Sequence, residues 1–123
     1  MRRILLAEDD ENIATIVSMC LEDEGYEVVQ RADGIEALKA IYDQKPLIVL
    51  LDLLLPRMSG YLILRALREN PATAELPVMV MSAKSQKEDI QEAYDQGADD
   101  YLVKPFTPSE LIEHVSRLID RGR

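Results

Sequence analysis

Short apolar runs alternate with segments of helical periodicity along the whole chain. The runs cover residues 4–7, 27–32, 48–52, 77–82 and 101–103, and each predicts a β-strand. The run at 48–52 lies between Pro46 and Pro56 and has no polar face, which is typical of a central parallel strand. It ends in Asp52. Because burying a carboxylate costs free energy, we expect this side chain at the point where the strand leaves the core.

Apolar residues three and four positions apart predict a helix after each strand. The predicted helices begin near residues 12, 35, 59, 86 and 108 and end near residues 24, 44, 70, 96 and 119. Asp10 or Asn12 is the expected cap of the first helix, Gly25 its stop, and Thr107 with Glu110 forms a capping box for the last. In the first two helices we expect the core-facing residues to be Ile13, Ile16, Val17, Cys20 and Leu21, and Ile35, Leu38, Ile41 and Tyr42.

Five strands that alternate with five helices predict one α/β domain over residues 1–123. Its expected architecture is a doubly wound five-stranded parallel sheet, covered by helices on both faces and linked by right-handed crossovers. A domain of 123 residues buries about two-thirds of its unfolded surface, so neither a disulfide nor a structural metal is needed for folding.

Composition narrows the function classes. The net charge of −9 argues against direct nucleic-acid binding, which depends on Lys and Arg that neutralise phosphates. The single cysteine, Cys20, allows no internal disulfide and indicates a reducing compartment. No apolar segment approaches the roughly 20 residues that span a membrane, and no signal-peptide pattern is present. We therefore expect a cytoplasmic protein without membrane contact.

Polar residues stand where the predicted strands end. They are Glu8 and Asp9 after the first strand, Asp52 at the third, Ser82 at the fourth and Lys104 at the fifth. If these strands are neighbours in the sheet, their carboxyl ends share one pocket. Each pair of carboxylates there repels by roughly 4 kcal/mol at about 4 Å and an effective dielectric near 20, which calls for a cation. Oxygen ligands without His or Cys indicate Mg²⁺, and Lys104 with Ser82 suits an anionic group beside it.

These motifs together resemble the receiver domains of two-component response regulators. The resemblance extends from about Arg2 to Ile119 and rests on five pieces in order: Glu8-Asp9; Asp52, Pro56 and Gly60 at their spacing; Ser82-Ala83; Gly97 to Tyr101; and Lys104-Pro105-Phe106. It implies a flavodoxin-like fold with strand order 2-1-3-4-5.

The resemblance also implies a role for each site residue. Asp52 would accept a phosphoryl group from a sensor histidine kinase or phosphotransfer protein, with Ser82 and Lys104 as the other catalytic residues. Mg²⁺ would be held by Asp9, Asp52, the backbone carbonyl of Leu54 and, through water, Glu8. Tyr101 would switch together with Ser82, and the Lys104–Pro105 bond would be cis.

The implied output surface is the face formed by the fourth helix, fifth strand and fifth helix, which would bind an output domain or effector protein. Such a domain catalyses only its own phosphoryl transfer and dephosphorylation. Ile90 and His114 stand where a dimerising subgroup has basic residues, so we expect a monomer or a weak, phosphorylation-dependent dimer. We expect His114 to face solvent.

Other interpretations of the same residues stay open. Taken singly, the acidic run at 8–11 fits a helix start, Ser82 a strand end and Lys104 a solvated surface residue. A haloacid-dehalogenase-like phosphatase also uses a strand-end aspartate with Mg²⁺, but it needs a second aspartate where this chain has Leu54. A pseudo-receiver that only binds partners is the third alternative, although no phosphorylation residue is missing here.

Overall fold

The computed structural model describes residues 2–121, which form a five-stranded parallel sheet. The strands are β1 (Arg3–Ala7), β2 (Glu27–Arg31), β3 (Ile48–Asp52), β4 (Val78–Ser82) and β5 (Asp100–Val103). Their order is β2-β1-β3-β4-β5, and all four neighbouring pairs are parallel. The predicted strand order is confirmed. The predicted domain ends, Met1 and Arg123, lie outside the described residues.

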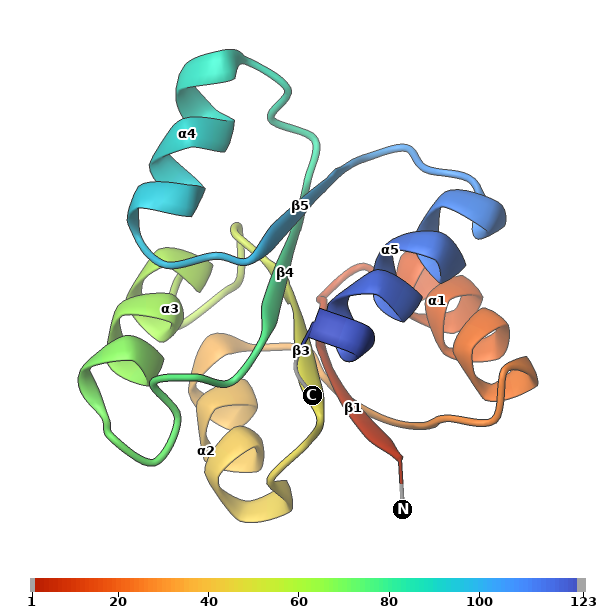
Figure 1. Ribbon diagram of the computed structural model, residues 1–123, viewed down its shortest axis with the longest axis horizontal. Helices are drawn as coiled ribbons and strands as arrows, with labels where there is room; N and C mark the ends of the chain where they lie inside the picture. Colours follow the sequence, from red (N-terminus) through yellow and green to blue (C-terminus); the bar gives the residue numbers. More distant parts are fainter. Residues whose placement is uncertain (1, 122–123) are drawn as a thin grey trace.

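One helix follows each strand. The helices are α1 (Glu11–Asp23), α2 (Gly34–Gln44), α3 (Gly60–Glu69), α4 (Lys87–Asp95) and α5 (Pro108–Arg121). Figure 1 shows α1 and α5 on one face of the sheet and α2, α3 and α4 on the other. The doubly wound α/β architecture is therefore confirmed. None of the helices in the described part of the chain has the length and hydropathy needed to cross a bilayer.

Two apolar cores flank the sheet, because successive side chains of a strand point to opposite faces. In β1, Leu5 and Ala7 join the core under α2, α3 and α4, whereas Ile4 and Leu6 join the core under α1 and α5. The central strand β3 is buried at every position, as its uninterrupted apolar sequence predicts. The same alternation decides which residues meet just beyond the strand ends.

The predicted core faces of α1 and α2 are partly wrong. Ile16 is 54% exposed and Tyr42 is 37% exposed, although the helical periodicity predicts both to face the core. Val17, Leu21 and Ile41 are buried as predicted. The other buried positions of these helices are the small residues Ala14, Gly34, Ala37 and Ala40. Small residues let a helix lie close to a sheet, and a stripe drawn through the large apolar residues alone is therefore rotated away from the true contact face.

Side-chain caps fix where the helices begin. Asp10 caps α1, since its carboxylate accepts from the backbone N–H groups of Asn12 and Ile13. The predicted capping box of α5 is present in both directions. The backbone N–H of Thr107 donates to the Glu110 carboxylate at 2.9 Å, and the backbone N–H of Glu110 donates to the Thr107 hydroxyl at 3.1 Å.

Candidate functional site

Strand alternation brings Glu8, Asp52 and Lys104 to one side of the sheet. Glu8 continues the β1 positions that face α1 and α5, and Asp52 does the same for β3 after Leu50. Leu6 and Leu50 are register partners, so the two carboxylates leave the sheet at the same level. Lys104 stands two positions beyond a β5 residue of that same face. Three segments remote in sequence thus converge on one point.

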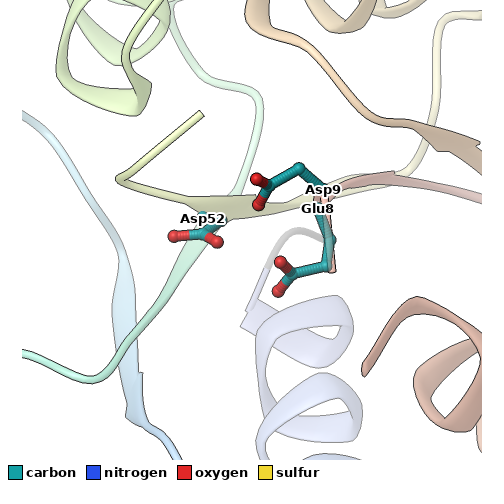
Figure 2. Close-up of side chains that lie close together, drawn as sticks. All are labelled: Glu8, Asp9 and Asp52. Atoms are coloured by element: carbon teal, nitrogen blue, oxygen red, sulfur yellow. The ribbon is translucent and has the colours of Figure 1, made fainter. Parts of the chain in front are cut away.

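Three carboxylates gather there. Oxygens of Glu8, Asp9 and Asp52 all lie within 4.8 Å of one another. Figure 2 shows the carboxyl groups of Glu8 and Asp9, from the end of β1, extending toward Asp52 at the end of β3. Glu8 is fully buried and Asp52 is 6% exposed, whereas Asp9 faces solvent. The cluster therefore has a buried side, formed by Glu8 and Asp52, and a solvent-facing side at Asp9.

Lys104 binds two of these carboxylates at once. Its ammonium donates to Glu8 Oε1 at 2.7 Å and to Asp52 Oδ2 at 3.1 Å. When ionised, the three carboxylates carry −3 and Lys104 adds +1, which leaves −2 in the pocket. A divalent cation would neutralise that remainder. The predicted juxtaposition of Lys104 with the acidic residues is present.

Burial and ion pairing act on these groups in opposite directions. Burial raises the pKa of Glu8 to about 7, against the opposing effect of its hydrogen bond with Lys104. For Lys104, burial alone would lower the pKa. The hydrogen bond to Glu8 and the charge of Asp52 outweigh burial, so the pKa of Lys104 is raised and the ammonium stays charged.

The Asp52 carboxylate is oriented through both of its oxygens. Oδ1 accepts from the backbone N–H of Leu54 at 3.0 Å, while Oδ2 faces Lys104. Gly60 lets the chain return close behind this strand end. A Cβ atom at position 60 would lie 2.5 Å from the Asp52 carbonyl oxygen, so a side chain there would displace the aspartate's backbone.

Ser82 and Tyr101 lie on the α4 side and bind the same residue. The Ser82 hydroxyl accepts from the backbone N–H of Lys84 at 3.1 Å, and the Tyr101 hydroxyl donates to the Lys84 carbonyl at 2.8 Å. Ser82 is 1% exposed and Tyr101 is 7% exposed. Burial raises the pKa of Tyr101, which keeps its hydroxyl a donor. The two predicted switch residues are thus linked through one peptide segment.

The donor set fits a hard divalent cation. The side-chain groups that could bind an ion here are carboxylates only, the ligands expected for Mg²⁺. The Lys104 ammonium contacts Asp52 Oδ2, whereas the Leu54 backbone N–H contacts Oδ1. Glu8, Asp9 and Asp52 are the residues that could hold the ion. The Lys104–Pro105 peptide bond is cis, as the resemblance implies.

An apolar cleft that the sequence did not predict adjoins the acidic pocket. Its volume is about 440 Å³, and it is lined by Ile13, Ile16, Val17, Ala83, Lys104, Pro105 and Phe106. Lys104 belongs to both the cleft and the pocket. The exposed Ile16, which the sequence placed in the core, contributes to this cleft. The sequence signal for this cleft is Ile16 itself, an apolar residue on a helix that already has enough apolar residues to pack against the sheet.

His114 does not face solvent freely, contrary to expectation. Its Nδ1 lies 2.7 Å from Asp100 Oδ2, and its side chain is 22% exposed. The pair joins α5 to the start of β5.

Residues 4–116 match the family model described as the response regulator receiver domain. The chain belongs to this family. The strand order is the one that the resemblance implies, and the three carboxylates and Lys104 lie together at one end of that sheet. It is a receiver domain of two-component systems.

Individual relatives agree with this assignment. The receiver domain is 40% identical over 121 residues to the DNA-binding dual master transcriptional regulator RpaA of Synechocystis, covering 98% of this chain and 50% of that protein. The chain thus spans about half the length of the curated relatives it matches.

Two solved structures show the same fold. A putative response regulator from Chloroflexus aurantiacus superposes with a TM-score of 0.93, at 35% identity and 98% coverage of each chain. The receiver domain of sensor histidine kinase PA1611 from Pseudomonas aeruginosa superposes with a TM-score of 0.89, at 32% identity, covering 97% of this chain and 98% of that one. The latter is described with a magnesium ion coordinated in the active site cleft.

Proposed function

We propose that Asp52 accepts a phosphoryl group from a sensor histidine kinase or phosphotransfer protein. The observation that carries this proposal is the Lys104 ammonium, which lies 3.1 Å from one Asp52 oxygen inside a cluster of three carboxylates. Phosphoryl transfer depends mainly on positioning and charge stabilisation, and this pocket supplies both around a single carboxylate.

In the proposed step, an Asp52 carboxylate oxygen attacks the phosphorus atom of a phosphohistidine. The new P–O bond forms as the P–N bond breaks, and the imidazole leaves with the electron pair of that bond. Lys104 pairs with one phosphoryl oxygen, and the Ser82 hydroxyl donates to another. These two side chains stabilise charge on the transferred group.

The proposed metal ligands are Asp9, Asp52 and the Leu54 backbone carbonyl, with Glu8 acting through water. A bound Mg²⁺ would neutralise charge on the phosphoryl oxygens and help to orient the phosphoryl group toward Asp52. The all-oxygen set and the residual charge of the pocket support this assignment.

The proposed switch runs through Lys84. If Ser82 turns toward a phosphoryl group on Asp52, the backbone N–H of Lys84 loses the acceptor that lies 3.1 Å away. Tyr101 binds the carbonyl of that same residue, so the movement reaches Tyr101 and the segment that leads into α4. Phosphorylation then favours the switched conformation, because the phosphoryl group contacts Ser82 only in that arrangement.

Two surfaces are assigned to partners in this proposal. The phosphodonor must approach over the open side of the pocket, and the apolar cleft that shares Lys104 gives it a surface to pack against. The face of α4, β5 and α5 binds an output domain or effector. RpaA carries a DNA-binding function in its name, whereas this domain, with a net charge of −9, does not itself contact nucleic acid in our proposal.

Residues on the α4–β5–α5 face already have partners within the chain. Asp99 accepts from Arg68 at 3.0 Å, and Asp100 lies 2.7 Å from His114. Both acids are therefore already paired within the chain, which reduces what a cross-subunit ion pair to either of them would add. We propose a monomer, or a weak dimer that forms on phosphorylation.

Acetyl phosphate with Mg²⁺ tests the function directly. The wild-type protein is expected to gain the mass of one phosphoryl group, and the Asp52→Asn variant is expected to gain none. An Asp52→Asn variant that labels normally would revive the phosphatase and pseudo-receiver alternatives. The Glu11→Gln variant, altered at an exposed acid in the first turn of α1, is the matched control and is expected to label like the wild type.

A further inference from the structure

The loop between β3 and α3, residues 53–59, is fastened to the start of α2. The Pro56 carbonyl accepts from the backbone N–H of Gly34 at 3.0 Å and from that of Met58 at 2.8 Å. Arg57 donates to Asp33 Oδ2 at 3.3 Å, while Oδ1 of the same aspartate caps α2 at 2.8 Å from the Glu36 N–H. These contacts hold the second half of the loop.

Close approach at this contact depends on the missing side chain of Gly34. A Cβ atom there would lie 1.8 Å from the Met58 carbonyl oxygen and 2.6 Å from its carbonyl carbon. Because the obstructing atoms belong to the backbone, no rotamer change can relieve the overlap. Any larger residue at position 34 must push the loop away from α2.

The first half of the loop is held from the other direction. The backbone N–H of Leu54 donates to Asp52 Oδ1 at 3.0 Å, and the Leu55 side chain is buried in the core at 8% exposure. Leu54 therefore belongs to a short stretch of chain that is held at Asp52 on one side and at Pro56 on the other. Because the loop is short and held at both ends, a displacement at Met58 is expected to move Leu54 as well.

We propose that Asp33 and Gly34 are positioning residues for the metal-holding loop. By fixing the segment from Pro56 to Met58, they set where the Leu54 carbonyl lies relative to the Asp52 carboxylate. Neither residue contacts the ion. The inference rests on the proposed function, because it takes the Leu54 carbonyl as a ligand of Mg²⁺.

Titration calorimetry with MgCl₂ tests this proposal on three variants and the wild type. Gly34→Ala is expected to weaken Mg²⁺ binding about tenfold, the size of effect typical of residues that orient a metal ligand. Asp33→Asn keeps the helix cap, because Asn caps as well as Asp, but loses the pairing of Arg57 with a charge. That pair is partly exposed, so its loss is expected to weaken binding by about two- to fivefold, less than the effect of Gly34→Ala.

Gly25→Ala is the control for glycine strain. Gly25 has φ +92° and nothing within 4 Å of its virtual Cβ, so alanine there strains the backbone without touching the loop. Its melting temperature is expected to fall while its Mg²⁺ affinity stays at the wild-type value.

A second readout needs no metal. In the metal-free protein, the amide ¹H–¹⁵N resonances of Leu54 and Met58 are expected to move in Gly34→Ala and to stay unmoved in Gly25→Ala. The inference fails, and the proposed metal site stands, if the wild type binds Mg²⁺ and Gly34→Ala shows the same Mg²⁺ affinity and the same Leu54 resonance as the wild type. A wild-type protein that binds no Mg²⁺ overturns the metal site as well. If Gly34→Ala does not fold, wild-type affinity in Asp33→Asn overturns the inference.

Discussion

Lys104 donates to Glu8 at 2.7 Å across 96 positions of sequence, inside a pocket where Glu8 is fully buried. The pair places a carboxylate of raised pKa directly beside an ammonium of raised pKa. Folding therefore changes the protonation of Glu8, and the stability of the metal-free protein must depend on pH through this residue.

The sign of that dependence follows from the direction of the shift. Glu8 titrates at 4.5 when unfolded and at about 7 when folded, so between these values the folded protein binds the extra proton. The stabilisation of the folded protein by this proton is fully present below pH 4.5 and is lost as pH rises through 7. The free energy of unfolding should fall by up to roughly 3 kcal/mol over this window, and Glu8→Gln should flatten it. Urea unfolding of metal-free protein at a series of pH values measures this; parallel curves for both proteins would contradict it.

Millimolar Mg²⁺ should raise the melting temperature of the wild-type protein. The ion would bind the assembled carboxylates of the folded state only, and a concentration of 100 times Kd is worth about 2.7 kcal/mol. Asp9→Ala should abolish this response and should keep or raise the metal-free melting temperature, because it relieves repulsion within the cluster. Glu11→Gln, a neighbouring acid outside the cluster, should respond like the wild type. A flat Mg²⁺ response in the wild type would remove the metal from this account.

The acyl phosphate on Asp52 should hydrolyse slowly. Leu54 follows Asp52 by two positions and is 64% exposed, and Lys84 follows Ser82 by two. Neither side chain has a carboxylate or amide that could orient an attacking water. Decay of labelled protein after removal of acetyl phosphate measures the lifetime. Leu54→Asn should shorten it and Leu54→Met should not, whereas a wild-type half-life of seconds would count against this explanation.

Arg68 should dominate the stability of the sheet end opposite the pocket. Its guanidinium donates to five acceptors, which are the carbonyls of Gly97, Thr73, Ala74 and Leu76 and the carboxylate of Asp99. A lysine ammonium cannot donate to all five of these acceptors, so Arg68→Lys should lower the free energy of unfolding by at least about 2 kcal/mol.

The matched control for Arg68→Lys is Arg65→Lys, an exposed position on the same helix, which should change stability little. Both variants should still label at Asp52 at temperatures where they are folded. Equal stability of the two variants would show that the contacts of Arg68 contribute nothing beyond those of a surface residue.

The sheet was predictable because its strands are short, largely apolar runs bounded by polar residues, proline or glycine. The site was predictable for a related reason: Glu8, Asp52, Ser82 and Lys104 are polar residues at the ends of those apolar runs, where burial is costly without a compensating partner. Each is a local signal in the sequence, and the parallel topology alone brings the signals together.

Contacts that depend on how closely a helix or loop packs against its neighbour leave no comparable signal in the sequence. Ile16 has the spacing of a core residue, but the buried face of α1 runs through Ala14 instead, and the role of Gly34 depends on how closely a distant loop approaches it. Arg68 likewise looks like any surface arginine in the sequence, since four of its five acceptors are backbone carbonyls, which any residue supplies.

The central claim is that Asp52 is the residue that carries the phosphoryl group. Borohydride reduction of acetyl-phosphate-labelled protein converts a phosphorylated aspartate into homoserine, and peptide mapping then locates it. We predict homoserine at position 52, in a Mg²⁺-dependent yield that falls sharply in Lys104→Met. Homoserine at Asp9 or elsewhere, or labelled protein with an unreduced Asp52, would contradict the account.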